Sequence, residues 1–231
     1  MKTVGMIGGV SWESTALYYQ VINESVRHQL GGLNSARLLI SSMNYQELVD
    51  YKNQNNWDQI ASILSKAAHN LEKAGVDAIA LCCNTLHKVA SIIEDRISIP
   101  FIHIADAAGT SLSQNEITTV GLLGTRFTME DVFYSDYLTK KYAIKTTIPT
   151  STMRGVIDNI IYKELCVGKC LKESKTTLLE AIELLEEQGA QAILLACTEL
   201  GLLIQPDDYH LPIFDTTYVH AKKIAEYGLS R

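Results

Sequence analysis

The chain has 231 residues, of which 47% are hydrophobic and 20% charged, a balance typical of a folded globular protein and unlike that of a disordered one. Its 26 acidic and 20 basic residues give a formal net charge of -6, without a cluster of lysines and arginines, which argues against nucleic-acid binding and a polybasic membrane surface. Because no apolar run approaches the roughly 18 residues of a membrane helix, and the apolar N-terminal patch is too short for a signal peptide, we expect a soluble cytoplasmic protein.

Apolar segments typical of strands alternate along the chain with segments of helical periodicity. Strands are expected at residues 2–7, 36–42, 77–82, 100–104, 118–123, 144–148, 192–196 and 212–214. Helices are expected at residues 12–30, 57–74, 86–95, 128–141, 152–166, 172–188 and 218–228. Such alternation predicts an α/β protein with parallel sheets that helices cover on both sides.

The two halves of the chain carry an internal repeat. GVDAIALCCNTLH, which begins at Gly75, aligns without gaps with GAQAILLACTELG, which begins at Gly189. VGMIGG at Val4 aligns in the same way with VGLLGT at Val120, and PFIHI with PIFDT, each pair about half the chain apart. The repeat predicts two pseudo-symmetric α/β domains that arose by internal duplication. The domains we expect are residues 1–104 with 215–231, and residues 105–214.

A cysteine stands at the same strand end in each half, Cys83 in the first and Cys197 in the second. In open α/β sheets, reactive groups lie beyond the carboxyl ends of the strands. Polar residues follow each cysteine at the expected start of a helix, whose N–H groups favour anions and lower the pKa of a thiol. If the halves face each other, a small carboxylate fits between the two thiols. One thiolate can then remove a proton from a carbon while the other thiol returns one to the opposite face.

Five motifs carry a resemblance to a known family: GMIGGVSWEST at Gly5, LGGLNSA at Leu30, CNTLH at Cys83, GLLGTRFTME at Gly121 and CTELGLL at Cys197. They resemble the aspartate/glutamate racemase family, and more closely its branch of broad-specificity or L-glutamate/aspartate-specific amino-acid racemases. The resemblance covers essentially the whole chain. It implies an amino-acid racemase that needs no cofactor, with an active site in the cleft between the two domains, and commonly a homodimer.

The resemblance also implies roles for individual residues. Cys83 and Cys197 match the two catalytic cysteines of the family, and no metal is implied. Asn84, Thr85 and Thr198 match positions that hold the substrate's α-carboxylate. The substrate contacts we expect are Val10, Ser11, Lys52, Asn84, Thr85, Thr125, Thr198 and Glu199.

The chain departs from the family pattern at three places that bear on the substrate. Val10 stands where members often carry methionine, and Cys166 stands where aspartate-selective members have a lysine. KNQNNW replaces an arginine-rich QRRGEW, which leaves Lys52 as the cation of the loop after the second strand, with Arg126 after Thr125 as the other cation of the expected loops. We expect acidic substrates to be held through Lys52 and backbone donors, glutamate first, aspartate second and homoserine third.

Several roles stay open on the sequence alone. His87 can reach Cys83 from the next helical turn or lie exposed, and Glu199 can relay a proton, tune Cys197 or cap its helix. Cys82, which alternates away from Cys83, is expected in the core, and Cys166 is structural or lines the pocket. The adjacent Cys82 and Cys83 rarely suit an unstrained disulfide, and zinc-ligand spacing is absent.

Other functions fit the same residues. Maleate isomerases and arylmalonate decarboxylases belong to the same superfamily but resemble this chain less at CNTLH and SWEST. A non-catalytic protein that binds small carboxylates would keep the fold and dispense with both thiols. These functions remain alternatives to racemisation.

Overall fold

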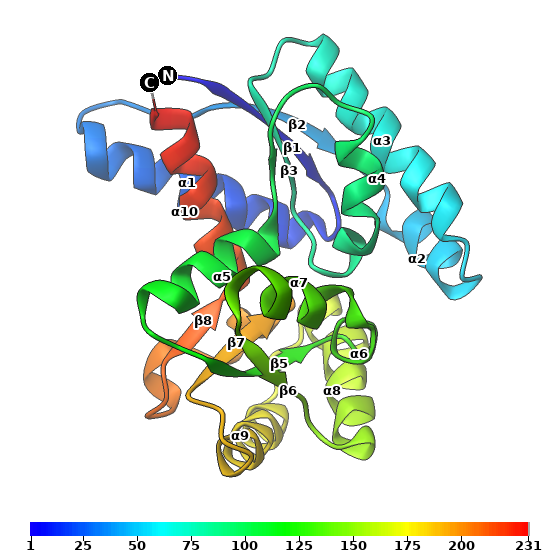
Figure 1. Cartoon of the computed structure of the whole chain (residues 1–231), viewed down its shortest axis with the longest axis vertical. Helices are drawn as coiled ribbons and strands as arrows, with labels where there is room; N and C mark the ends of the chain where they lie inside the picture. The colour runs from blue at the N-terminus through cyan, green and yellow to red at the C-terminus, as the bar shows by residue number, and fades with distance from the viewer. Residues whose placement is uncertain (231) are drawn as a thin grey trace. The chain divides into compact units, whose positions relative to one another are not determined.

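The computed structural model describes residues 1–230, which form two four-stranded parallel sheets with flanking helices (Figure 1). The strand order is β2-β1-β3-β4 in the first sheet and β6-β5-β7-β8 in the second, so the two sheets share one topology. Neighbouring strands are parallel throughout. The expected fold class, two similar α/β halves, is therefore confirmed.

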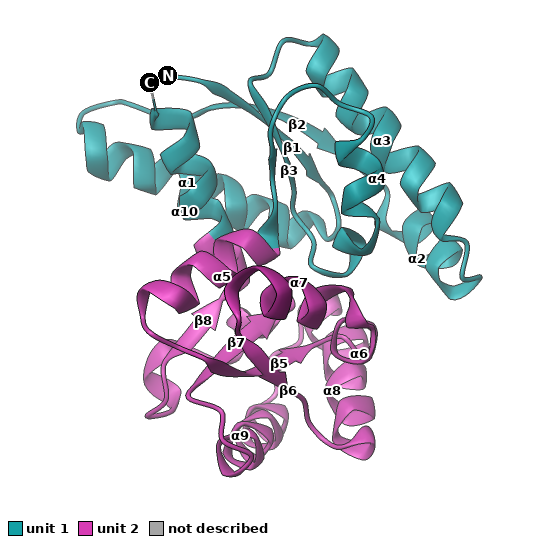
Figure 2. Cartoon of the chain, viewed as in Figure 1, with its two compact units in different colours: residues 1–104, 220–231 teal, residues 105–219 magenta. Residues whose placement is uncertain are grey.

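The chain divides into two compact units (Figure 2). The first unit comprises residues 1–104 together with the chain from residue 220 onward, and the second comprises residues 105–219. The first unit is thus built from two separate stretches of chain, which meet where the Lys2 N–H donates to the Gly228 carbonyl at 2.8 Å. The second unit is one continuous stretch.

The first unit holds the sheet of β1 to β4. Its strands are β1 (Thr3–Gly8), β2 (Arg37–Ser42), β3 (Ala78–Leu81) and β4 (Phe101–Ile102). Its helices are α1 (Trp12–Leu30), α2 (Tyr45–Asn53), α3 (Trp57–Lys73), the 3-10 helix Thr85–Val89, α4 (Ala90–Glu94) and most of α10 (Thr216–Leu229).

Helices cover both faces of this sheet, which explains why β3 reads as a continuous apolar run. On one face, Met6 and Ala80 pack with Tyr18 of α1 and Ile224 of α10. A second core on the other face includes the strand residues Ile7, Ile79 and Leu81 with Leu64 of α3. Figure 1 shows α1 and α10 on one side of the strands and α3 and α4 on the other.

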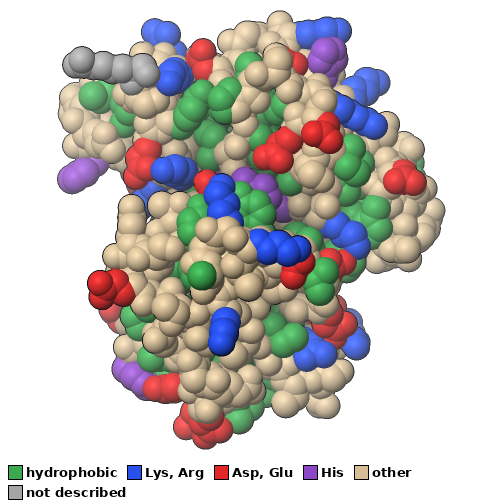
Figure 3. All heavy atoms as spheres, in the orientation of Figure 1, with side chains coloured by type: hydrophobic (Ala, Val, Ile, Leu, Met, Phe, Trp, Pro, Cys, Tyr) green, Lys and Arg blue, Asp and Glu red, His purple; other side chains and the backbone are tan. Residues whose placement is uncertain are grey.

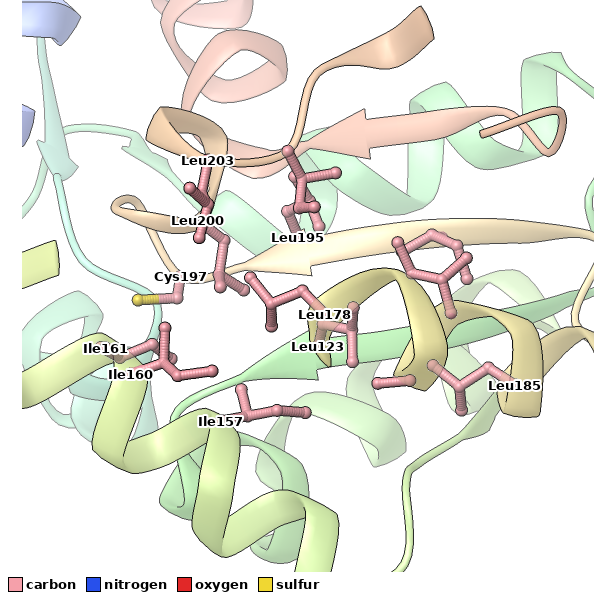
Figure 4. Packing of buried hydrophobic residues seen from close by; sticks show 14 of the residues in the cluster. Leu123, Ile157, Ile160, Ile161, Leu178, Leu185, Leu195, Cys197, Leu200 and Leu203 are labelled. Carbon is pink, nitrogen blue, oxygen red and sulfur yellow. The ribbon is translucent and has the colours of Figure 1, made fainter. Parts of the chain in front are cut away.

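The second unit holds the sheet of β5 to β8. Its strands are β5 (Thr119–Gly124), β6 (Lys145–Thr147), β7 (Ala192–Ala196) and β8 (Ile213–Asp215). Its helical segments are α5 (Ile104–Gln114), α6 (Arg126–Glu130), α7 (Val132–Tyr142), α8 (Ser151–Lys163), α9 (Lys172–Glu187) and the 3-10 helices Leu165–Val167, Leu200–Leu202 and Pro206–Asp208. Leu123 and Leu195 of the strands pack against Ile157 of α8 and Leu178 of α9 (Figure 4).

The structure corrects several element predictions. Helices α2 and α5 were not expected, and the helix expected at 128–141 is two helices, α6 and α7. Asp131 separates these two because its backbone is extended and its carboxylate accepts the Phe133 N–H at 3.2 Å, which starts a new helix. The helix expected at 86–95 is a 3-10 helix followed by the short α4.

The surface agrees with the charge balance of the sequence. Lysines and arginines are interspersed with aspartates and glutamates on the face shown in Figure 3. Among the described residues, no helix is both long and apolar enough to cross a membrane.

Candidate active site

Cys82 and Cys83 follow the buried strand β3 and enter opposite sides of the first sheet. Cys82 belongs to the core that contains Tyr18 of α1, whereas Cys83 belongs to the core that contains Val10 and Leu64. Burial raises the pKa of Cys82, which keeps it a neutral thiol in the interior. This placement confirms the expectation that Cys82 is a core residue.

Hydrogen bonds hold the Cys83 backbone on both sides of its Cα atom. Its N–H donates to the Leu81 carbonyl at 2.9 Å, and its carbonyl lies 2.6 Å from Nδ1 of His87. Asn84 and Thr85 come next and begin the 3-10 helix Thr85–Val89. All three side chains, Cys83, Asn84 and Thr85, are buried at the carboxyl edge of the sheet.

The loop after β1 lies beside the loop after β3, because Ile7 and Leu81 are paired in neighbouring strands. Gly9 makes this loop possible, since its φ is +77° and a Cβ there would overlap the Met43 backbone. Val10 is buried in the same core as Cys83. Ser11 caps α1 by accepting the Ser14 N–H at 3.4 Å. The first unit thus brings Val10, Ser11, Cys83, Asn84 and Thr85 to one edge.

Among the substrate contacts expected in the first unit, Lys52 is the one whose expected location was wrong, because it lies in a helix and not in a loop. It occupies the last turn of α2 and is half-buried. The expectation of a loop was wrong because α2 buries only Leu48, so its sequence lacks the apolar stripe that marks a helix.

Cys197 follows β7 of the second unit as Cys83 follows β3 of the first. Its thiol donates to Oε2 of Glu199 at 3.1 Å, and the Thr198 hydroxyl donates to the same oxygen at 2.8 Å. Cys197 is 6% exposed, and Thr198 and Glu199 are buried with it. In Figure 4 the sulfur points away from Leu195 and Leu178 of the core behind it.

Burial raises the pKa of the Cys197 thiol well above its ordinary value, and the carboxylate of Glu199 raises it further. The expectation that a helix N-terminus lowers the pKa of this thiol was therefore wrong. The segment after Glu199 is the 3-10 helix Leu200–Leu202, and a helix of this length supplies too small a dipole to offset a buried carboxylate. Cys197 is accordingly a protonated thiol near neutral pH.

Thr125 and Arg126 follow β5, whose Gly124 is paired with Ala196 at the end of β7. The Thr125 hydroxyl caps α6 by accepting the Thr128 N–H at 3.2 Å. Arg126 lies in α6 rather than in a loop, and its Nε is 2.8 Å from Oε1 of Glu130. This edge of the second sheet therefore gathers Thr125, Cys197, Thr198 and Glu199.

Asp215 is a half-buried acid that the sequence reasoning missed. It ends β8 and is paired in the sheet with Leu195, two residues before Cys197. Burial is the main cause that raises the pKa of Asp215 to about 6, and the charge of Glu199 contributes, although the Thr217 N–H donates to its Oδ1 at 2.7 Å. The alignment of PFIHI with PIFDT could have drawn attention to Asp215, because it pairs this residue with His103, another titratable side chain.

The remaining candidates are placed as follows. Cys166 lies in the 3-10 helix Leu165–Val167, is half-buried and packs against the core that contains Cys197. All five cysteines are free thiols. Within residues 1–230, no group of three or more His, Cys, Asp or Glu side chains could hold a metal ion.

Comparisons with known proteins agree on one family. The family model described as Asp/Glu/Hydantoin racemase matches residues 7–224. The broad specificity amino-acid racemase RacX of Bacillus subtilis is 28% identical over 167 residues, which is 71% of this chain and 70% of RacX.

Solved structures match the whole chain as well. An inferred Asp/Glu racemase from Yersinia pestis is 44% identical, with a TM-score of 0.94 and coverage of 100% of both chains. PH1733 of Pyrococcus horikoshii, described as an aspartate racemase homologue, is 31% identical, with a TM-score of 0.87 and the same coverage.

Proposed function

Because this chain belongs to the Asp/Glu/hydantoin racemase family and is a racemase, we propose that it inverts the α-carbon of an acidic amino acid with Cys83 and Cys197 as its two acid/base groups. No cofactor takes part in this proposal. The observation that carries it is the like placement of the two cysteines: Cys83 lies two residues after β3 and Cys197 one residue after β7, the matching central strands of two sheets with the same strand order.

The proposed reaction moves one proton off the α-carbon and another onto it. The thiolate of one cysteine takes the α-proton and becomes a thiol, and the electron pair of the C–H bond passes into the α-carboxylate as an enediolate. The thiol of the other cysteine then gives its proton to the opposite face and becomes a thiolate. After one inversion the two cysteines have exchanged protonation states; the reverse reaction or proton exchange with solvent restores the starting state, and no electrons leave the substrate.

The buried thiol of Cys197 supports a role as proton donor in the resting enzyme. Burial and Glu199 keep its pKa high, so it holds its proton near neutral pH. Glu199 accepts the S–H bond and offers a place for that proton when Cys197 must act as the base. We therefore propose Glu199 as a group that exchanges protons with Cys197.

The α-carboxylate needs hydrogen-bond donors, and these must strengthen as charge develops on it. Buried hydroxyl and amide side chains stand beside both cysteines, and we propose Ser11, Asn84, Thr85 and Thr125 for this role, with Thr198 joining them once its hydroxyl turns from Glu199 to the substrate. We assign Val10 to the wall of the site because it shares a core with Cys83.

The choice of an acidic substrate rests on the family and on Lys52. A buried side-chain carboxylate is very costly without a cation or several donors, and Lys52 is the cation we propose for it. Glutamate is our first choice and aspartate the second. The resemblance further supports a homodimer, which sedimentation velocity measures, and the free thiols suit a reducing compartment such as the cytoplasm.

The deciding experiment incubates L- or D-glutamate and L- or D-aspartate with the pure protein in D2O. Chiral chromatography measures the inverted product, and mass spectrometry measures deuterium at the α-carbon. Wild type should give both. Cys83→Ser and Cys197→Ser should each abolish inversion, because a hydroxyl is too weak a base near neutral pH, while each retains exchange of one enantiomer at most.

Other outcomes favour the alternatives. Turnover of maleate or an arylmalonate without α-deuteration of amino acids would favour the isomerase or decarboxylase reading. Ligand affinity without turnover, unchanged in both serine variants, would favour a carboxylate-binding protein. Activity that survives hydroxylamine and EDTA but is lost to iodoacetamide would support thiol chemistry, and near wild-type racemisation by Cys83→Ser would exclude the two-base mechanism.

A further inference from the structure

His87 is a buried imidazole that links two backbone groups of the first unit. It is 3% exposed, its Nδ1 lies 2.6 Å from the Cys83 carbonyl oxygen, and its Nε2 accepts the Ile104 N–H at 3.1 Å. A carbonyl oxygen can only accept, so Nδ1 carries the proton, and Nε2 keeps its lone pair for Ile104. Both partners therefore require the same neutral tautomer.

The surroundings of His87 keep it neutral. The ring of His103 packs against it edge-on at a centroid distance of 4.4 Å, with the ring of His220 at 6.2 Å. Burial is the main cause that lowers the pKa of His87 well below its ordinary value, and the neighbouring His103 and His220 add to it. An imidazole held neutral in this way serves as a fixed donor and acceptor.

The two hydrogen bonds of His87 join the loop that carries Cys83 to the end of the neighbouring strand. Cys83 follows β3, and Ile104 begins α5 two residues after β4, which pairs with β3. The Cys83 N–H is already held by the Leu81 carbonyl. The direction of the Cα–Cβ bond follows from the backbone on both sides of it, so the hydrogen bond from His87 helps to orient this thiol.

In the second unit, the backbone beside Cys197 is held without an imidazole. The internal repeat aligns His87 with Gly201 and His103 with Asp215. A Cβ on Gly201 would overlap Oδ2 of Asp215, so this carboxylate fills the space that a side chain would take. The Cys197 carbonyl instead accepts the Leu200 N–H at 3.1 Å, a bond within its own turn.

We propose that His87 is the positioning residue of Cys83, which it orients by donating to the Cys83 carbonyl without touching the substrate or taking its proton. Its catalytic consequence rests on the function proposed above. The structural consequence, a Cys83 loop that loosens while the Cys197 loop does not, stands independently of it.

Two variants of equal polarity separate the two hydrogen bonds. The amide nitrogen of His87→Asn takes the place of Nδ1 and can still donate to the Cys83 carbonyl. The amide of His87→Gln reaches the place of Nε2, where its oxygen can accept the Ile104 N–H, but it leaves the Cys83 carbonyl without its donor. If His87 acts through Cys83, Asn should rescue what Gln loses.

Three measurements on the full chain distinguish His87→Gln from His87→Asn. Amide hydrogen exchange of peptides that cover residues 82–88 and iodoacetamide labelling of Cys83 should each be about tenfold faster in His87→Gln than in wild type, the factor for about 1.4 kcal/mol. Labelling of Cys197 should not change. With glutamate or aspartate, kcat should fall about tenfold or more with KM within about twofold, and His87→Asn should stay within about threefold of wild type throughout.

His220→Gln is the matched control. His220 is another buried neutral histidine of the first unit, but its nitrogens contact the Tyr18 hydroxyl and the Ile102 carbonyl rather than Cys83. It should lower the melting temperature as much as His87→Gln does while Cys83 labelling and kcat stay at wild-type values.

Equal behaviour of His87→Asn and His87→Gln, or equal labelling of Cys83 in His87→Gln and His220→Gln, would overturn the proposal and leave His87 a packing residue. If wild type racemises no amino acid, the function proposed above fails, while the exchange and labelling measurements still decide the role of His87.

Discussion

The Cys197 thiol and the Glu199 carboxylate share a hydrogen bond of 3.1 Å in a buried site, where the carboxylate is the acceptor. A negative charge at this distance opposes ionisation of the thiol, and the bond itself stabilises the protonated form. The pair therefore favours the protonated form of Cys197.

Glu199→Gln should lower the pKa of Cys197, because the amide carries no charge. We expect the pH profile of Cys197 labelling by iodoacetamide to shift to lower pH, so that labelling at neutral pH becomes about tenfold faster. Peptide mass spectrometry follows Cys197 and Cys83 in the same sample, and the Cys83 profile is the internal control. A Cys197 profile that does not move would show that burial alone sets this pKa.

His220 should make the first unit sensitive to acid. Burial lowers the pKa of His220 from 6.5 to about 4, so the unfolded chain binds its proton first as the pH falls. The stability it contributes is present above pH 6.5 and is lost between pH 6.5 and 4, to the extent of about 3 kcal/mol. Asp215 of the second unit opposes this trend, since its raised pKa favours the folded state as the pH falls.

The test compares urea unfolding of wild type and His220→Gln at pH 7.5 and pH 4.5. Both tryptophans, Trp12 and Trp57, lie in the first unit, so their fluorescence reports its unfolding. His220→Gln should be less stable at pH 7.5 because it strains two buried hydrogen bonds, but it should lose less stability on acidification. The same loss in both proteins would contradict the assignment.

Gly201→Ala should destabilise the second unit by about 1–3 kcal/mol, because the new methyl group overlaps the carboxylate of Asp215. In the Asp215→Ala background, the same change should cost much less, which a double-mutant cycle on thermal melting measures. Gly155→Ala is the control: a Cβ at Gly155 meets nothing within 4 Å in helix α8, so alanine should add about 0.5–1 kcal/mol. Additive effects of Gly201→Ala and Asp215→Ala would exclude the contact.

Lys52→Ala should reduce selectivity for acidic substrates if Lys52 holds the distal carboxylate. A charge-assisted hydrogen bond is worth about 1.5–3 kcal/mol, so the ratio of kcat/KM for glutamate over homoserine should fall by roughly one to two decades. Lys73→Ala is the control, since Lys73 also ends a helix, α3, but is exposed. An unchanged ratio in Lys52→Ala would make Lys52 a surface lysine and place the distal carboxylate elsewhere.

The sequence predicted most of the sheet because its central strands are buried on both faces. Residues 192–196 form β7 as expected, and the repeat around Cys83 and Cys197 predicted two sheets of like construction. Such strands leave a continuous apolar run that tertiary packing does not alter. The family follows from the same segments, since the motifs at Cys83 and Cys197 lie directly after them.

Short helices were harder to predict because their signals are weak. Helix α5 starts at Ile104, two residues after β4 ends, and its sequence IADAAGTSLSQ offers small residues in place of a broad apolar stripe. The protonation of Cys197 also lay beyond the sequence, because it depends on which side chains surround the thiol. The sequence named Glu199 as a neighbour but could not say that its carboxylate accepts the S–H bond in a buried site.

The division of the chain into one continuous and one split unit has a consequence for the order in which the protein folds on the ribosome. The core of the first unit includes Ala221, Ile224 and Ala225 of α10, against which Met6 and Tyr18 pack. These residues are synthesised after the whole of the second unit, so until then only α1 covers this face of the first sheet. The second unit has all of its strands by residue 215. We therefore expect the second unit to complete its core before the first unit does, although the first sheet is synthesised earlier.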